Sequence, residues 1–203
     1  MFASVALALL AVGQAAAQSM VIPDLSLQVG LPINLNADSS EFDRRDNRLL
    51  FRGLTITQGT LSVRADTAEA SRLDFENSQW TFRGNVEIDN GGARVYCEDA
   101  RLNFQGHELK VAALAGKPAI FEQKRADGKV TRGRAATIDY DVAGGSLAMS
   151  GNAQVNDGAN EVSGDRITYD LRREYVTAQS GSNGPVVFKI DPPRPRPATR
   201  TRP

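Results

Sequence analysis

Four acidic residues recur at one place in a repeated pattern, and they are the first candidates for chemistry in this 203-residue chain. Asp38, Asp66, Glu98 and Asp165 each follow a small residue. A ladder of carboxylates could bind metal ions, and a pair beside a cleft could hydrolyse a glycosidic bond. Calcium-binding β-repeats, however, need a glycine-rich nonapeptide period that this sequence lacks. We therefore interpret these acids as solvated strand side chains and predict no metal site.

The sequence offers few other groups for catalysis. His107 is the only histidine and Cys97 the only cysteine, and neither a phosphate loop nor a G-x-S-x-G motif occurs. For Cys97 we expect a small buried thiol and no intrachain disulfide. The 24 basic residues balance 24 acidic ones, so the chain lacks the basic field that holds nucleic acid. We predict a protein that is not an enzyme and uses no cofactor. A polysaccharide hydrolase and a purely structural β-repeat protein are the alternatives.

The two ends of the chain differ in composition from the middle. Val5 to Val12 is an apolar run, followed by small residues at Ala15 to Ala17, which is typical of a signal peptide over residues 1–17. A buried N-terminal helix is the alternative. Residues 18–31 form a lead segment, and residues 191–203 hold five of the nine prolines and four arginines. That composition predicts a disordered tail, because proline cannot donate to a sheet.

Short alternating runs of apolar and polar residues fill the middle of the chain. Ile33 to Asp38, Leu61 to Asp66 and Asn85 to Asp89 show the period of two that predicts half-buried strands. Gly-containing pairs such as Gln58-Gly59 and Asn90-Gly91 supply residues for tight turns between antiparallel strands. His107 to Ala115 could instead form one face of a helix, but its place in the repeat favours a strand.

Five imperfect repeats organise these strands and position the acids. Each repeat leads to a glycine within a strand, and the spacings between these glycines are 31, 32, 35 and 30 residues. The glycines are Gly53, Gly84, Gly116, Gly151 and Gly181. Glycine inside a strand marks a kink or bulge, so kinks in register should curl the sheet. The sequence predicts an all-β, elongated, antiparallel jellyroll-like open half-pipe of about five repeats over residues 32–190.

The residues between Pro32 and Lys189 resemble the OstA-like family of lipopolysaccharide-transport proteins. The resemblance is carried by Ile33 to Asp38, by Phe51-Arg52-Gly53 with Thr57 to Thr60 and Val63 to Asp66, by Gly116 to Phe121, and by Gly151-Asn152 through Gly164 to Tyr169. It implies a periplasmic protein whose apolar trough carries the acyl chains of lipid A between the inner and outer membranes. It also implies docking end to end with copies of itself and with related inner- and outer-membrane transport proteins.

Alternation assigns a set of apolar residues to the inner face of the trough, where they could bind lipid or simply fill a core. Trp80 and Phe82 lie beside the Gly84 kink and could line a cavity. The predicted inner-face residues are Ile33, Leu35, Phe51, Val63, Trp80, Phe82, Val86, Ile88, Val95, Phe121, Ile138, Tyr140, Met149 and Val155.

The two end strands of the repeat array are predicted to be its open edges. The strand at Ile33 to Asp38 begins the array, and Val186 to Ile190 ends it before the proline-rich tail. Unpaired edges invite pairing, so we predict a head-to-tail homo-oligomer built through these terminal strands.

Overall fold

The computed structural model describes residues 30–190, apart from residues 74, 126, 127, 159, 171, 174 and 183. Every regular element in this part is a β-strand, so it contains no helix that could cross a membrane. The strands are β1 (Asn34–Asn36), β2 (Ser39–Asp43), β3 (Arg48–Gln58), β4 (Leu61–Ala70), β5 (Asn77–Asn90), β6 (Ala93–Gln105), β7 (Glu108–Lys124), β8 (Val130–Asp141), β9 (Ser146–Asn156), β10 (Asn160–Asp170), β11 (Tyr175–Gln179) and β12 (Val187–Ile190).

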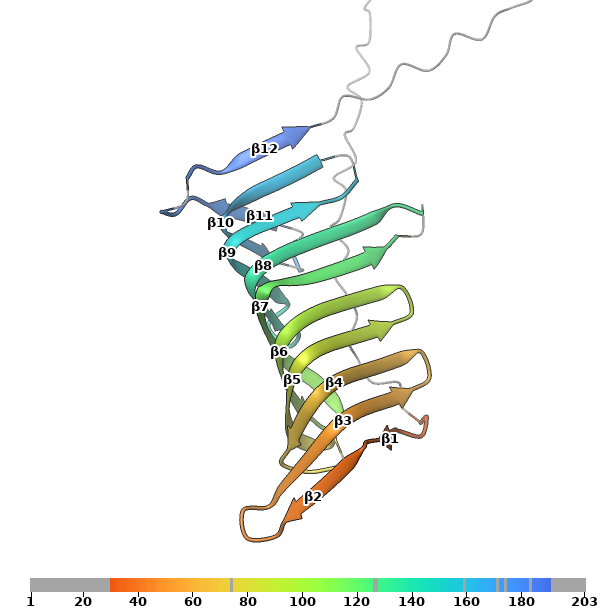
Figure 1. Ribbon diagram of the computed structural model, residues 1–203. Coiled ribbons are helices and arrows are strands. Elements are labelled where there is room, and N and C mark those ends of the chain that lie inside the picture. The colour runs from red at the N-terminus through yellow and green to blue at the C-terminus, as the bar shows by residue number, and fades with distance from the viewer. Residues whose placement is uncertain are drawn as a thin grey trace, which may run out of the picture.

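The strands form one antiparallel sheet. From β3 to β10 each strand pairs with the next, giving the long twisted stack in Figure 1. The ends of the stack are branched: β1 and β2 both pair with β3, and β11 and β12 both pair with β10. The segment His107 to Ala115 is confirmed as strand, because β7 runs from Glu108 to Lys124. The signal peptide and the tail predicted from the sequence lie outside the described residues.

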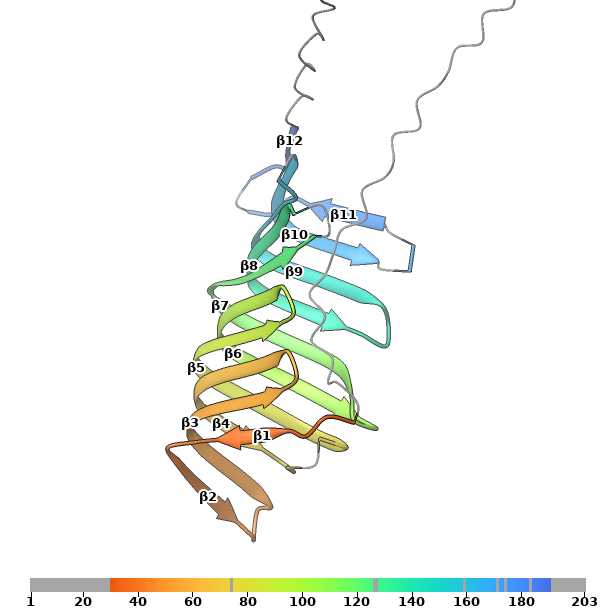
Figure 2. The same cartoon turned by 90° about the vertical axis from the view of Figure 1, so that its right-hand side faces the viewer.

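Each long strand bends once, and the bends line up across the sheet. The ladders lose register at Arg64/Thr67 between β4 and β5, and at Arg83/Val86 between β5 and β6. Equivalent shifts occur between the later pairs up to β10. Figure 2 shows the strands bending along one side of the stack, from which two arms of sheet extend. We call the aligned bends the corner.

The corner divides every long strand between the two arms. Arm A holds β2, β11 and residues 48–52, 67–70, 77–83, 99–105, 108–115, 137–141, 146–150 and 166–170. Arm B holds β1, β12 and residues 54–58, 61–65, 86–90, 93–97, 119–124, 130–135, 153–156 and 160–163.

Glycines and acids at matching positions build the corner. Gly84 has a φ of 75°, which favours glycine, and a methyl group there would overlap the carboxylate of Asp66 on the neighbouring strand. The same juxtaposition joins Gly53 to Asp38 and Gly181 to Asp165. Three of the four acids recognised in the sequence, Asp38, Asp66 and Asp165, therefore have a structural role. Asp38, Asp66 and Glu98 are exposed and Asp165 is half-buried.

Candidate functional site

Apolar side chains from both arms meet in the space between them and form one continuous cluster. Alternation along each strand sends every second side chain into this space, as the burial of β6 shows from Val95 to Phe104. Eleven of the fourteen predicted inner-face residues are buried members of the cluster. Ile33, Leu35 and Tyr140 are partly buried and pack against it. The structure thus brings all fourteen together, while their contact with lipid stays a prediction.

Stacked aromatic rings fill the cluster in arm A. The ring centroids of Phe51 and Trp80 lie 6.0 Å apart, and those of Trp80 and Phe82 lie 5.8 Å apart. Phe75 stacks on Trp80 at 4.6 Å with an interplanar angle of 5°, and it meets the edge of Phe104 at 5.4 Å. Trp80 and Phe82 are therefore packed against other rings, as core residues are. We call these five residues the aromatic cluster.

Two members of the aromatic cluster are absent from the predicted set. Phe104 could have been found, because Ala100, Leu102 and Phe104 alternate along one strand. Phe75 lies in the loop between β4 and β5, outside any alternating run. Its φ of 54° turns the ring back onto the core, which sequence periodicity does not reveal.

The inner face is almost free of polar groups. Gln58, Ser78 and Thr131 are the buried polar residues of the described part. Within the described ranges, the buried atoms Ser62 Oγ, Ser78 Oγ and Trp80 Nε1 have no hydrogen-bond partner. An apolar surface with so few polar atoms can hold hydrocarbon.

Cys97 lies on the inner side of β6, next to the corner, and is buried. Burial, together with the negative charge of Asp99, raises the pKa of the thiol to about 12. The thiol therefore stays protonated at neutral pH, where it is a poor nucleophile. Cys97 behaves as a small apolar core residue, as the sequence predicts.

Charged residues lie on the outer faces of the arms and pair across strands. Arg132 Nε lies 2.6 Å from Glu122 Oε1, and Arg64 Nη1 lies 3.8 Å from Glu87 Oε2. Within the described ranges, no group of three or more His, Cys, Asp or Glu side chains is placed to hold a metal ion. The outer faces carry solvated ion pairs that contribute little stability.

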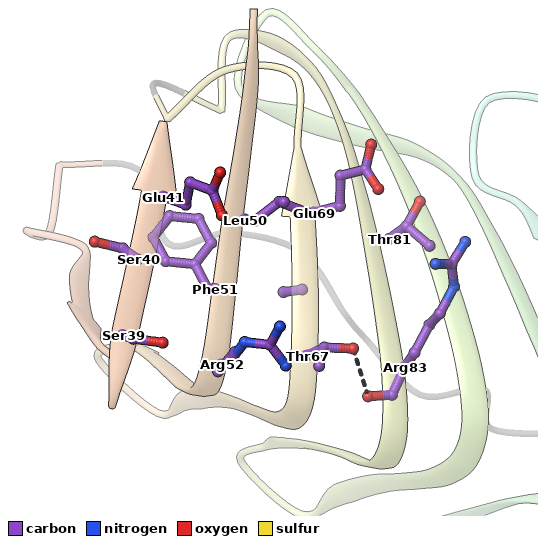
Figure 3. Close-up of a pocket in the computed structure, with 11 residues that line it drawn as sticks. Ser39, Ser40, Glu41, Leu50, Phe51, Arg52, Thr67, Glu69, Thr81 and Arg83 are labelled. Carbon is purple, nitrogen blue, oxygen red and sulfur yellow. Dashed lines mark hydrogen bonds between the residues drawn. The ribbon is translucent and has the colours of Figure 1, made fainter. Parts of the chain in front are cut away.

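A groove of about 530 Å³ lies on the outer face of arm A across β2 to β5. Figure 3 shows Arg52 and Arg83 on this surface together with Glu41 and Glu69. Both signs of charge are represented, and Arg83 also lies 3.8 Å from Asp99. The groove therefore has no net field that would select an anion or a cation.

Exposed apolar side chains gather at the ends of the stack. Every residue of β12 is exposed, including Phe188 at 65% and Ile190 at 72% of full exposure. Tyr175 on β11 and Phe42 on β2 are also exposed apolar residues of edge strands. The strands predicted from the sequence to be edges thus occupy the two ends of the sheet.

The chain matches a known family over most of this stack. Residues 67–175, more than half of the chain, match the family described as "LptA/(LptD N-terminal domain) LPS transport protein". The chain belongs to this LptA/LptD N-terminal domain family. The matched range runs from within β4 to the first residue of β11, so it covers the central strands of both arms.

Individual LptA-type relatives agree with this assignment. The lipopolysaccharide export system protein LptH of Pseudomonas aeruginosa is 31% identical over 138 residues, which cover 67% of this chain and 75% of that protein. The lipopolysaccharide export system protein LptA of Escherichia coli is 28% identical over 127 residues, covering 62% of this chain and 69% of that protein.

A solved structure shares the fold. The crystal structure of LptH from Pseudomonas aeruginosa, the LptA homologous periplasmic component of the conserved lipopolysaccharide transport device of that organism, matches with a TM-score of 0.51 and 23% identity. The match covers 79% of this chain and 96% of that one. The all-β open stack predicted from the sequence is therefore confirmed.

Proposed function

We propose that this chain is a periplasmic lipopolysaccharide-transport protein that holds the acyl chains of lipid A between arms A and B. The observation that carries the proposal is the single apolar cluster that runs between the arms along the whole stack. Burying each methylene of an acyl chain contributes about 0.8 kcal/mol, so several long chains would bind firmly without any catalytic group. The names of the LptA and LptH relatives support the same transport role.

The construction of the fold supports entry of a ligand between the arms. Backbone hydrogen bonds join neighbouring strands within each arm, and every pair of strands in close backbone contact is such a hydrogen-bonded pair. The arms are joined by the corner and by side-chain packing. Opening them would therefore break apolar contacts, which acyl chains can replace, and would leave the ladder hydrogen bonds intact.

Assembly is the second part of the proposal. The branched ends of the stack carry unpaired edge strands with exposed apolar residues such as Phe188 and Ile190. Pairing of β1 of one copy with β12 of the next would extend arm B, and pairing of β2 with β11 would extend arm A. Together these contacts would continue the trough. Related transport proteins at the two membranes would dock in the same way, so that the chain forms part of a bridge between membranes.

Native mass spectrometry tests the function, with the protein purified from the periplasm of a bacterium that produces lipopolysaccharide. We expect adducts with the mass of lipopolysaccharide or lipid A, lost after extraction with organic solvent. Release of unmodified lipid would also support a non-enzymatic role, because a hydrolase would leave shortened saccharides. A protein free of lipid that also takes up no added lipid A would support the purely structural alternative.

A further inference from the structure

Two polar atoms on the inner face of β5 are left without partners in an apolar setting. Trp80 is fully buried, and its Nε1 has no acceptor among the described residues. Ser78, two residues earlier on the same face, is also buried, and its Oγ lacks a partner in the same part of the chain. Buried donors are nearly always paired, because an unpaired one has lost its hydrogen bonds to water without replacement.

A residue with an unusual backbone conformation packs against Trp80. Phe75 has a φ of 54°, a conformation that is unusual for a bulky residue. Its ring stacks on Trp80 at 4.6 Å and is itself buried. Backbone strain persists only where surrounding contacts hold it, and it concentrates at ligand clamps and switches. Stacking on the face of Trp80 therefore holds the Phe75 ring in the core, and its release would relieve backbone strain and open space beside the indole.

We propose that Trp80 Nε1 donates a hydrogen bond to the carbonyl oxygen of a bound fatty acyl ester, after the Phe75 ring has moved aside. This inference rests on the proposed function and adds a residue that distinguishes among apolar ligands. Ser78 Oγ is the second donor available on that face.

The chemistry of the site selects a carbonyl over other polar groups. A carbonyl oxygen accepts hydrogen bonds and donates none, so a lone N–H in an apolar wall satisfies it. A carboxylate would be a buried charge, and the buried polar residues of the described part, Gln58, Ser78 and Thr131, include no cation to pair with it. The hydrocarbon chain of an acyl ester begins next to the carbonyl carbon, so it would pack against the side chains of the aromatic cluster.

A matched pair of surfactants tests the proposal with the full chain. Sucrose monolaurate carries an ester carbonyl, whereas dodecyl maltoside has the same number of chain carbons, a disaccharide head and no carbonyl. Both are titrated below their micellar concentrations, with displacement of the apolar fluorophore N-phenyl-1-naphthylamine as the readout. We expect the ester to bind about fivefold more tightly, the worth of one net hydrogen bond.

Two variants assign the difference to the indole N–H. Trp80→Phe keeps an aromatic ring but removes the donor, so the fivefold preference for the ester should disappear, whatever change in affinity the two surfactants share. Ser62→Ala removes an unpartnered hydroxyl on the outer face of arm B and should leave the fivefold preference in place. Trp80 is the only tryptophan. Its emission in the parent should therefore move to longer wavelength with the ester and not with the ether, a readout that needs no variant.

The outcomes separate this inference from the proposed function. Equal binding of both surfactants by the parent, or a preference that survives in Trp80→Phe, would overturn the role of Trp80 while leaving the apolar trough standing. Binding of neither surfactant, together with failure to bind lipid A, would overturn both proposals.

Discussion

The side-chain amide of Asn85 donates a 2.9 Å hydrogen bond to Oδ2 of Asp66 on the neighbouring strand. Asn85 has a φ of 47° and follows Gly84, whose φ is 75°. Two successive left-handed residues bend β5, and the carboxylate of Asp66 occupies the space left by the missing side chain of Gly84. The corner is thus held by a contact between an acid and a glycine that lie 18 residues apart in the sequence.

Substitution of Gly84 should test this contact. Gly84→Ala adds a methyl group that overlaps Asp66, and we expect it to lower the free energy of unfolding by about 3 kcal/mol in urea titrations. Gly106→Ala is the matched control, because Gly106 has a φ of 60° and open space around it. The control should cost about 1 kcal/mol. Equal losses in the two variants would show that the Asp66 contact is unimportant.

Charging the inner face should cost far more than charging the outer face. Phe82→Asp places an unpaired carboxylate in the aromatic cluster, and we expect a loss of about 4 kcal/mol of stability and of most lipid binding. Arg83→Asp, one residue further on, changes an exposed side chain that is 3.8 Å from Asp99 and should cost less than about 1 kcal/mol. Urea unfolding and lipid extraction measure the two effects. If both variants retain lipid equally, the inner-face assignment is wrong.

Proline at either end of the stack should prevent assembly. Leu35→Pro on β1 and Phe188→Pro on β12 each remove a backbone N–H from an edge strand. Light scattering over a range of concentrations should show growing oligomers for the parent and monomers for both variants. Phe188→Thr keeps the N–H while removing an exposed ring, so it separates strand pairing from apolar contact. A parent that stays monomeric at high concentration would refute the assembly proposal.

The Cys97 thiol should be unreactive toward alkylating reagents until the protein unfolds. Its pKa is raised to about 12, so we expect negligible alkylation by iodoacetamide at pH 8 in buffer and rapid alkylation in urea. The unfolded thiol loses its proton near its ordinary pKa, below the folded value. The contribution of Cys97 to stability should therefore be constant at neutral pH and fall as the pH rises above about 9. Cys97→Ala should lack that part of the alkaline decline.

The periodic features of the sequence predict most of this fold, because alternation and regular glycines act locally. The strand at His107 to Ala115 followed from its place in the repeat, although its residues also fit a helix. The corner was only partly predictable: the sequence shows the glycines, but the seating of Asp66 against Gly84 depends on cross-strand register. Phe75 could not be predicted, since a loop residue enters the core only through a backbone conformation that its residue type disfavours.

Each end of the stack presents two edges, because β1 and β2 share β3, and β11 and β12 share β10. A flat sheet can therefore pair with only one of the two edge strands at an end, whereas a partner bent at the same angle can pair with both. The second contact then forms within an already tethered pair, which multiplies the two affinities. In such an assembly, we expect the bend along the corner to favour partners with the same bent cross-section over ordinary exposed strands.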